Sequence, residues 1–243
     1  MKILVLGASG ATGRLVVMQL IKRQIKCRAV VREQAILSAE ILSNPLVEVE
    51  RGNFGEFDES KVADLLQDCT AVISCLGHNI TFKGLFGSPR NLVSDAVKII
   101  DAVAEKREDG KIKLILMSTT AYTDTKAGEK ARLGDRIVLS IMKLALPPHR
   151  DNVKAADFLR ETVKKENRKM EWTAVRPDTL IDVEMESPYE VHGSLMRSPV
   201  YDAGKTSRIN VSHFMVDLLS NDALWEKWRF KMPVIYNLQN SSL

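Results

Sequence analysis

The first twenty residues contain a glycine pattern that is typical of phosphate binding. Gly7, Gly10 and Gly13 follow the apolar run 3–6 and lead into the apolar segment 15–20, which predicts a strand, a tight turn and a helix start. Glycine permits the turn, brings bare backbone close to a ligand and lets the helix pack against its strand. The first N–H groups of a helix, together with its dipole, favour an anion. We therefore expect a dinucleotide pyrophosphate to bind here.

The spacing of this pattern is G-x-x-G-x-x-G, whereas the commoner dinucleotide fingerprint is G-x-G-x-x-G. Its position, directly after a predicted strand, favours phosphate binding over a turn without a ligand. Ser9 and Thr12 add hydroxyl donors. The residues expected to contact the cofactor at this turn are Gly7, Ser9, Gly10, Ala11, Thr12 and Gly13.

The end of the second predicted strand bears on which dinucleotide binds. A carboxylate there would accept hydrogen bonds from the ribose of NAD, but the sequence has Arg32, whose guanidinium suits a 2′-phosphate. Arg14 can support the same phosphate, and Glu33 can pair with Arg32 or contact a ribose. The sequence favours NADP, with NAD as the alternative. In the other interpretation Arg32 is a solvated loop cation.

Two later strand ends supply further candidates for cofactor binding. Asn53 and Phe54 follow the third predicted strand and offer an amide and a flat ring to adenine, or simply form the turn. Cys75, Leu76 and Gly77 end the fourth predicted strand on the expected path of the nicotinamide ribose. Gly77 permits a close approach of backbone to the ligand.

These residues need a scaffold that brings the strand ends together. Short β-branched runs alternate with longer amphipathic segments. This predicts strands at 2–6, 26–31, 46–50, 70–75, 112–117 and 171–175, and helices near 12–23, 34–42, 59–67, 90–107 and 151–166. Parallel neighbours need crossover connections, so we expect an α/β fold with a doubly wound, mostly parallel Rossmann sheet and helices on both faces. Residues 1–243 are expected to form a single domain, with the less regular segments 119–150 and 178–205 on the substrate side.

Composition excludes several classes of protein. The 35 basic and 31 acidic residues leave a net charge of +4, too mild and too evenly spread to indicate nucleic-acid binding. Cys27, Cys69 and Cys75 lack metal-ligand spacing and are expected to be reduced core residues, with no metal bound. No segment reaches the roughly eighteen consecutive apolar residues of a membrane span. We expect a cytoplasmic monomer or homodimer that binds a small-molecule substrate.

Several motifs together resemble a known family. They are GASGATGR at 7–14, VVR at 30–32, AVISCLG at 71–77, MSTT at 117–120 and TAVRP at 173–177. In this order and at these intervals they resemble an atypical short-chain dehydrogenase/reductase of the NAD(P)H-binding, NmrA-like group, most similar to its flavin reductase and biliverdin-IXβ reductase branch. Segment 207–215 is similar to a strand leading into a helix in that branch. The resemblance covers nearly the whole chain and is more specific for fold and cofactor than for substrate.

The wider superfamily carries a Tyr-x-x-x-Lys pair on the helix after the fifth strand, where lysine lowers the tyrosine pKa and holds the ribose. Tyr122 and Lys126 have this spacing but lie in a predicted loop, where side chains four residues apart do not share a face. In the helix expected from about residue 151, Arg150 stands in the tyrosine position and Lys154 in the lysine position. This departure argues against alcohol or ketone dehydrogenation. The flavin reductase branch works without the tyrosine.

The resemblance implies hydride transfer from NADPH to a flat aromatic acceptor, such as free flavin or a quinone-like compound. Such an acceptor needs orientation more than a general acid, because alignment supplies much of the rate gain and water can supply the proton. The resemblance places Ser118 at the nicotinamide. The catalytic candidates are Ser118, Lys154, His78 and Tyr122, and further cofactor contacts are expected from Ser118, Thr119, Lys154 and Pro177. On the acceptor side, His78, Tyr122, Phe82 and Phe86 offer rings and one imidazole, or else serve as local core and capping residues.

Two rival functions remain open from the sequence. The NmrA-like group includes regulators that sense the dinucleotide without turning it over, and the missing tyrosine fits these as well. The fold also hosts nucleotide-sugar epimerases and dehydratases, which generally keep the tyrosine and have a longer C-terminal substrate domain. The apolar segment 135–148 predicts a helix ended by prolines, which could be a lid, a dimer face or, most simply, a core-packing helix.

Overall fold

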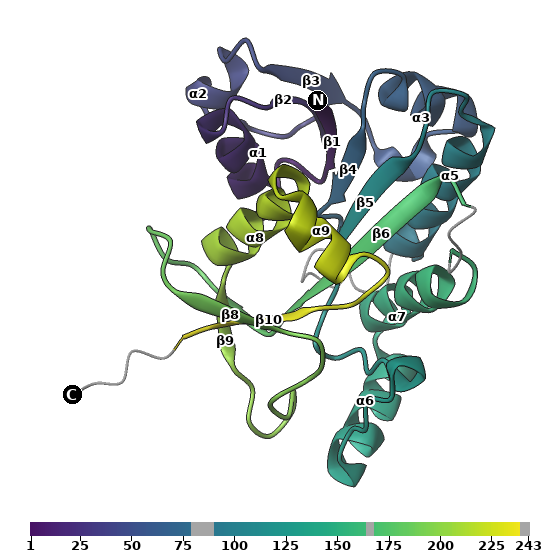
Figure 1. Ribbon diagram of the computed structural model, residues 1–243, viewed down its shortest axis with the longest axis vertical. Helices are drawn as coiled ribbons and strands as arrows, with labels where there is room; N and C mark the ends of the chain where they lie inside the picture. The colour runs from purple at the N-terminus through teal and green to yellow at the C-terminus, as the bar shows by residue number, and fades with distance from the viewer. Residues whose placement is uncertain (79–89, 164–167, 239–243) are drawn as a thin grey trace.

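The computed structural model describes residues 1–78, 90–163 and 168–238. Over these ranges the chain forms an eight-stranded sheet in the order β3-β2-β1-β4-β5-β6-β10-β8, beside a small sheet of β7 and β9 (Figure 1). The strands are β1 (Lys2–Leu6), β2 (Lys26–Val31), β3 (Val47–Arg51), β4 (Ala71–Ser74), β5 (Ile112–Met117), β6 (Met170–Pro177), β7 (Thr179–Ile181), β8 (Tyr189–His192), β9 (Lys205–Ser207) and β10 (Val234–Asn237).

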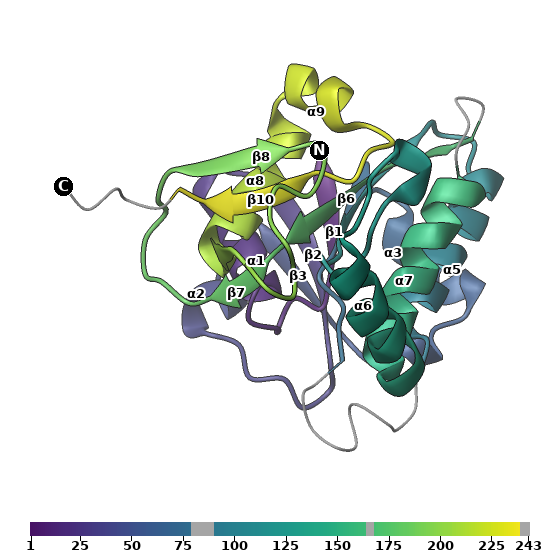
Figure 2. The ribbon, with the colours of Figure 1, turned by 90° about the horizontal axis from the view of Figure 1, so that it is seen from below.

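Helices cover both faces of the sheet. The described helices are α1 (Gly13–Lys22), α2 (Ala39–Leu42), α3 (Glu59–Leu66), α5 (Leu92–Lys106), α6 (Leu133–Ala145), α7 (Pro147–Glu161), α8 (Arg208–Ser220) and α9 (Asp222–Trp228), with 3-10 turns at Phe54–Glu56 and Thr125–Ala127. Figure 2 shows α1, α8 and α9 on one face and α3, α5 and α7 on the other.

The alternation of side chains along β1 explains this layering. Ile3 and Val5 enter the core beneath α1 and α8, whereas Leu4 and Leu6 enter the core beneath α3, α5 and α7. A strand buried on both faces must be apolar at every position, which is why residues 3–6 form an uninterrupted apolar run.

Neighbouring strands from β3 through β10 pair in parallel, and β8 alone of the eight is antiparallel, to β10. The carboxyl ends of the parallel strands therefore share one edge of the sheet. In open α/β sheets this edge is where ligands bind. The doubly wound Rossmann sheet predicted from the sequence is confirmed.

The last third of the chain contains more strands than the sequence indicates. Strands β7, β8, β9 and β10 have only three or four residues each, too few for a periodic pattern to stand out. The strand and helix implied by the family resemblance near residues 207–215 are present as β9 and α8. Helix α2 has four residues, fewer than the expected 34–42.

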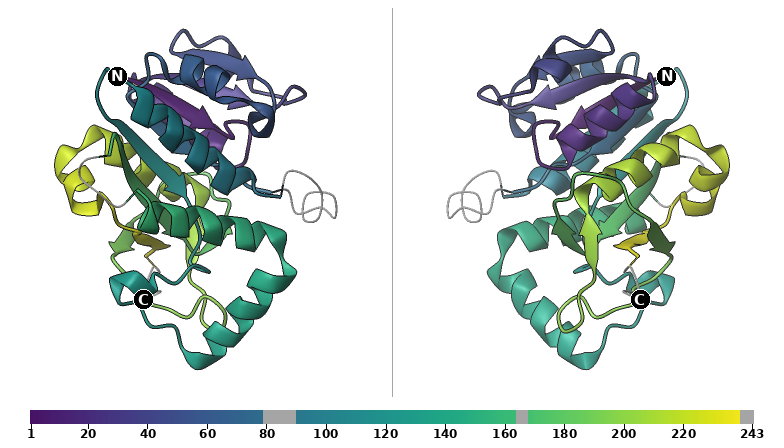
Figure 3. Two further views of the ribbon diagram at one scale, coloured as in Figure 1. Left: turned by 90° about the vertical axis from the view of Figure 1, so that its right-hand side faces the viewer. Right: turned by 90° about the vertical axis from the view of Figure 1, so that its left-hand side faces the viewer.

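Helix α6 differs most from expectation. Four of its apolar side chains lie on an exposed stripe, formed by Leu133, Ile137, Ile141 and Leu144. The helix packs mainly on α7 and projects from one end of the molecule (Figure 3). The expectation of a core-packing helix is therefore wrong, because only one edge of α6 reaches its neighbour. No helix in the described ranges combines the length and hydrophobicity that crossing a bilayer requires.

The three cysteines are buried and free, as the sequence predicts. Burial raises the pKa of Cys27 and of Cys75 to about 12, and that of Cys69 to about 11. Since the thiolate is the reactive form, these thiols are chemically inert in the folded state.

We predict that a thiol reagent such as dithionitrobenzoate labels the native protein slowly at pH 8 and labels three thiols once denaturant is added. The folded state keeps each sulfur buried and protonated. The released chromophore, followed with and without denaturant, measures both amounts. Rapid labelling of a native thiol would contradict this placement.

Candidate functional site

In the glycine turn after β1, the backbone of Gly7 packs directly against the backbone of Cys75 and of Gly13. Gly7 has φ +71°, and a Cβ there would lie 2.8 Å from the carbonyl oxygen of Cys75. A Cβ on Gly13 would collide with the carbonyl oxygen of Gly7. Side chains are thus excluded at both places, and α1 begins against the ends of β1 and β4.

This turn leaves N–H groups free to bind an anion. Gly10 N donates to Gly7 O at 2.9 Å, and Arg14 N donates to Gly10 O at 3.0 Å. Between them, the N–H groups of residues 11–13 have no backbone acceptor among the described residues. Helix N-termini with unpaired N–H groups favour phosphate, so this cradle fits a dinucleotide pyrophosphate. Gly10 and Ala11 are exposed, Ser9 is half-buried, and Thr12 is the buried N-cap residue of α1.

Arginines gather where β2 and β3 end. Arg32 follows β2 directly and is exposed, as is Arg14 in the first turn of α1. Arg51, which ends β3 opposite Val31, donates to Glu33 O at 2.7 Å and to Ala35 O at 3.1 Å. Arg51 therefore braces the turn that carries Arg32. Arg51 was not among the residues predicted from the sequence, although a second arginine at a strand end was a usable signal.

Asn53 and Phe54 have structural roles in this fold. The Asn53 carboxamide caps the 3-10 turn by accepting from Gly55 N at 3.3 Å, and it donates to Glu56 Oε1 at 2.7 Å. Phe54 is buried in the core and meets Phe57 edge-on with ring centroids 5.6 Å apart. The geometry does not support a Phe54 ring lying flat on adenine, because that ring is packed inside.

The ends of β4 and β5 carry two buried hydroxyls. Ser74 Oγ and Ser118 Oγ have no hydrogen-bond partner among the described residues. Cys75 N donates to Leu6 O at 3.0 Å, and Ser118 N to Val175 O at 2.7 Å, so both segments continue the sheet at its carboxyl edge. A buried hydroxyl without a partner is costly, and Ser118 Oγ is therefore suited to meet a ligand. Leu76 is half-buried and Gly77 is exposed, and no described residue lies within 4 Å of a Cβ built on Gly77.

The segment after Ser118 is tied to the end of β6. Thr119 Oγ1 accepts from Ala121 N at 3.1 Å, and Thr120 N donates to Pro177 O at 3.3 Å. Thr120 Oγ1 also donates to Asp178 Oδ1 at 3.3 Å. Burial raises the pKa of Asp178, and hydrogen bonds from Gly204 N, Thr179 N and Thr120 oppose that rise.

A buried ion pair fixes the loop beyond. Arg176 is fully buried in β6 and donates to both carboxylate oxygens of Glu129, at 2.8 and 2.5 Å. It also donates to Tyr122 O at 3.0 Å. Glu129 in turn accepts from Leu195 N at 3.3 Å, so one carboxylate joins the two segments expected on the substrate side.

Asp151 on α7 organises the other side of the site. Its carboxylate is fully buried and accepts from Val93 N at 2.8 Å and Ser94 N at 3.0 Å, in the first turn of α5. His78 Nε2 lies 2.9 Å from its Oδ2. A carboxylate only accepts, so this nitrogen carries a proton. Burial by itself would raise the pKa of Asp151, but the hydrogen bonds from His78, Ser94 and Val93 outweigh it and lower that pKa.

His78 was predicted from the sequence as a site residue, but its partner Asp151 was not. Asp151 lies 73 residues from His78 and 57 from Ser94, so no local pattern connects them. The only available signal was a carboxylate one residue beyond Arg150, at the start of a predicted helix.

The two lysine candidates are held in different ways. Lys154 on α7 donates to Asn91 Oδ1 at 3.0 Å, next to the start of α5, and Arg150 is exposed. Lys126, in the 3-10 turn Thr125–Ala127, donates to Glu161 Oε1 at 2.6 Å. The expected loop character of residues 122–126 agrees with this placement.

Tyr122 is a core residue. Its side chain is 7% exposed, and its hydroxyl donates to Asp157 Oδ1 at 2.9 Å. Burial, followed by the charge and hydrogen bond of Asp157, raises the pKa of the phenol. This arrangement gives Tyr122 a structural role and disfavours it as a proton donor to substrate. Phe82 and Phe86 lie outside the described residues.

Comparisons with known proteins agree with this geometry. A family model described as NAD(P)H-binding matches residues 7–222. A search of curated proteins by sequence finds no match. Among solved structures, a short-chain dehydrogenase/reductase from Veillonella parvula in complex with NADP is similar with a TM-score of 0.67 at 14% identity, covering 99% of this chain and 95% of the other.

Two further structures share the fold. A proposed NADH-flavin reductase from Streptococcus pneumoniae has a TM-score of 0.68 at 21% identity, covering 98% of this chain and all of the other. The anaerobilin reductase ChuY from Escherichia coli O157:H7 has a TM-score of 0.67 at 17% identity, covering 99% and 100%. At these identities the likeness shows the fold. The NAD(P)H-binding family and the Rossmann fold, both implied by the motifs, are confirmed.

We predict that Asp151→Asn lowers the free energy of unfolding by about 2–4 kcal/mol at pH 7, because an amide turns donor hydrogens toward groups that themselves donate. The folded-state pKa of Asp151 is lowered. The ionised carboxylate therefore contributes its full stabilisation of the folded state above the unfolded-state pKa of about 3.9. This stabilisation is lost as the pH falls further.

Denaturant unfolding gives the free energy of unfolding of both proteins from pH 7 down to the lowest pH at which they fold. The difference between wild type and variant should narrow below about pH 4. Asp95→Asn, an exposed change in the same first turn of α5, is the matched control and should cost less than about 1 kcal/mol. Equal stability of wild type and Asp151→Asn at pH 7 would contradict the role of Asp151.

Proposed function

The chain belongs to the NAD(P)H-binding family, and from this premise we propose that it is an NADPH-dependent reductase that transfers hydride to a flat aromatic acceptor, such as a free flavin or a quinone-like compound. The observation that carries the proposal is the buried, unpartnered hydroxyl of Ser118 at the same sheet edge as the glycine cradle. A cofactor whose phosphates lie on the start of α1 would extend along this edge toward Ser118.

The proposed preference for NADPH rests on the arginines at the ends of β2 and β3. Arg32 is exposed and has no ion pair among the residues that the structure describes. Arg51 holds the turn of Arg32 by two backbone hydrogen bonds. A guanidinium positioned in this way suits a 2′-phosphate, which it can bind through two parallel hydrogen bonds.

In the proposed reaction the chain orients the reactants more than it performs acid–base chemistry. When bound, NADPH would supply the hydride for reduction of the acceptor, and water would supply the proton. In this proposal Lys154, which donates to Asn91, contacts a ribose, and Ser118 Oγ, which lacks a partner among the described residues, binds the nicotinamide end. His78, with its proton directed at Asp151, is a positioning residue for the start of α5.

The second candidate is a regulator that senses the redox state of NADP without turnover. The observation that favours it is the arrangement of Tyr122, whose hydroxyl is committed to Asp157, with Arg150 exposed in the position of the missing tyrosine. Such a chain would keep the glycine cradle and the arginines but would not bind an acceptor productively.

A steady-state assay separates the two candidates. Purified protein with NADPH and a panel of riboflavin, FMN, FAD and quinones should oxidise NADPH well above a blank without protein. The variant Gly13→Val, whose Cβ would collide with the carbonyl oxygen of Gly7 and so disrupt the turn, is the control without an intact phosphate cradle. Tight NADPH binding without turnover on every acceptor would favour the sensor.

We predict that Arg32→Ala weakens NADPH binding at least tenfold and NADH binding by less than about twofold, because a charge-assisted pair with the 2′-phosphate is lost. Quenching of protein fluorescence by each cofactor gives the two dissociation constants. Arg208→Ala is a matched control at the start of α8, where the arginine pairs with Asp182. Equal losses for NADPH and NADH would contradict the 2′-phosphate site.

We predict that Tyr122→Phe leaves turnover within a few-fold of wild type and lowers stability by about 1 kcal/mol, since one hydrogen bond to Asp157 is removed while the ring keeps its packing. The steady-state assay and thermal unfolding measure the two effects. A hundredfold loss of kcat, on the scale of a removed general acid, would contradict this assignment.

A further inference from the structure

Helix α6 (Leu133–Ala145) is apolar on two opposite sides. Its outer side carries the exposed stripe, whose four members are between 54% and 85% exposed: Leu133, Ile137, Ile141 and Leu144. Its inner side carries three half-buried apolar residues, Val138, Leu139 and Met142. A helix with apolar residues all round is normally buried all round, and a contiguous apolar patch on a surface marks a binding site. The stripe therefore indicates that α6 meets a partner.

A buried carboxylate fixes which side of α6 faces outward. Asp135 is 2% exposed and accepts from Ser198 Oγ at 2.6 Å. That oxygen in turn accepts from Tyr201 N at 2.8 Å, and the ring of Tyr201 packs against Gly134 in the first turn of the helix. Turning the stripe inward would break the hydrogen bond of a buried charge, which is costly. The stripe is thus held in its outward position.

The exposed charges around the stripe have one sign. Every charged side chain that is exposed between residues 130 and 150 is basic, and these residues are Lys130, Arg132, Arg136, Lys143 and Arg150. None of the five makes an ion pair with another residue that the structure describes. This end of the molecule therefore favours an anionic partner.

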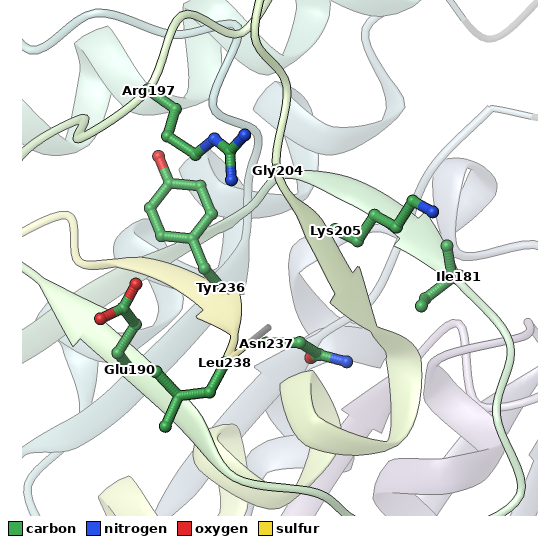
Figure 4. Close-up of a pocket in the computed structure, with 8 residues that line it drawn as sticks. All are labelled: Ile181, Glu190, Arg197, Gly204, Lys205, Tyr236, Asn237 and Leu238. Atoms are coloured by element: carbon green, nitrogen blue, oxygen red, sulfur yellow. The ribbon is translucent and has the colours of Figure 1, made fainter. Parts of the chain in front are cut away.

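The acidic side chains nearby are already paired. Glu129 is buried with Arg176, and Asp202 lies 2.6 Å from Arg197. Arg197, followed by the more distant charge of Arg132, lowers the pKa of Asp202. Figure 4 shows Arg197 beside Tyr236, in the lining of the hollow among β8, β9 and β10. The exposed charge at α6 thus remains positive.

The basic residues of α6 lie along one flank of the stripe. Arg136 and Lys143 are seven residues apart, so they share a side of the helix about a quarter turn from the stripe. From this position a long side chain can keep its charge in water or at a headgroup while the neighbouring apolar side chains are buried. Helices that lie in the interface of a membrane have this arrangement.

The shape of α6 favours a lipid surface over a protein. The helix projects as a ridge from one end of the molecule (Figure 3). A ridge fits a partner protein only where that protein has a matching groove, whereas a lipid surface adapts to a convex apolar shape. A second copy of this chain, docked through the same stripe, would bring two sets of like charges together.

We propose that α6 binds an anionic lipid surface and lies along the interface with its stripe among the acyl chains. Arg136 and Lys143 supply charge at the headgroups, and the ring of Tyr201, which is 66% exposed, lies at the same level. This binding goes beyond the proposed reductase function and does not depend on it.

Sedimentation of the full chain with sucrose-loaded vesicles measures its binding to lipid. One set of vesicles is phosphatidylcholine, which has no net charge, and the other is an equimolar mixture of phosphatidylcholine and phosphatidylglycerol, which is anionic. Wild type should bind the anionic vesicles at least tenfold more tightly, because each basic residue at an anionic surface strengthens binding about fivefold. Added salt should weaken this binding.

Two double variants separate the apolar contribution from the charged one. Ile141→Ser with Leu144→Ser should weaken binding to the anionic vesicles at least tenfold, because less apolar surface enters the interface. Arg136→Gln with Lys143→Gln should weaken it about twentyfold, because two charges are lost. All four side chains are exposed, and thermal unfolding checks that both variants fold.

Matched controls carry the same kinds of change elsewhere on the surface. Ile36→Ser with Leu42→Ser removes two exposed apolar side chains near α2. Lys26→Gln with Lys205→Gln removes two exposed basic charges at the starts of β2 and β9. Both controls should bind the anionic vesicles as wild type does.

A fluorescent reporter in the stripe tests contact with lipid directly. The tryptophans already in the chain are buried: Trp172, Trp225 and Trp228. In the variant Ile141→Trp, the indole introduced in the stripe should shift its emission to the blue when anionic vesicles are added, because it moves from water into the apolar boundary of the bilayer.

Failure of wild type to bind anionic vesicles, equal weakening by the matched controls, or an unshifted emission from Ile141→Trp would overturn the proposal. A concentration-dependent dimer that Ile141→Ser with Leu144→Ser abolishes in analytical ultracentrifugation would also overturn it, since the stripe would then bind a second copy. None of these experiments measures oxidation of NADPH, so their outcome is separate from that of the reductase proposal.

Discussion

The contact of Gly7 with two other stretches of backbone constrains the rest of the site. The carbonyl of Cys75 occupies the place of a Gly7 Cβ, and the carbonyl of Gly7 occupies the place of a Gly13 Cβ. Three segments therefore meet without a side chain between them. This brings the free N–H groups of α1 to the same edge as the ends of β4 and β5, where a long ligand can touch all of them.

Buried charges constrain the other side of the candidate site, where α5 and α7 lie. Asp151 joins α7 to the first turn of α5 and to His78, and it does so as a buried anion satisfied by N–H donors. Arg176 and Glu129 likewise join β6 to the loops at 122 and 195. Buried charges are tolerated when their hydrogen bonds are complete. These bonds fix where the loops around the proposed acceptor site lie.

Features encoded by neighbouring residues were predictable from the sequence, and features that depend on distant pairing were not. The glycine turn, the strand-end Arg32 and the alternating cores of β1 follow from local pattern. The hydrogen bonds of Asp151 join residues that are far apart in sequence, so no spacing could reveal them. Phe54 looks the same in sequence whether its ring covers a ligand or fills a core, and only packing decides.

The proposed reductase function requires that bound NADPH reduces an acceptor and is not merely sensed. An anaerobic single-turnover experiment tests it most directly, with protein loaded with NADPH mixed rapidly with FMN. We expect the absorbance bands of the dihydronicotinamide and the oxidised flavin to decay together, in equal amounts, and more slowly when C4 of the nicotinamide carries deuterium. Bound NADPH that persists unoxidised beside FMN and the other flavins and quinones would contradict it.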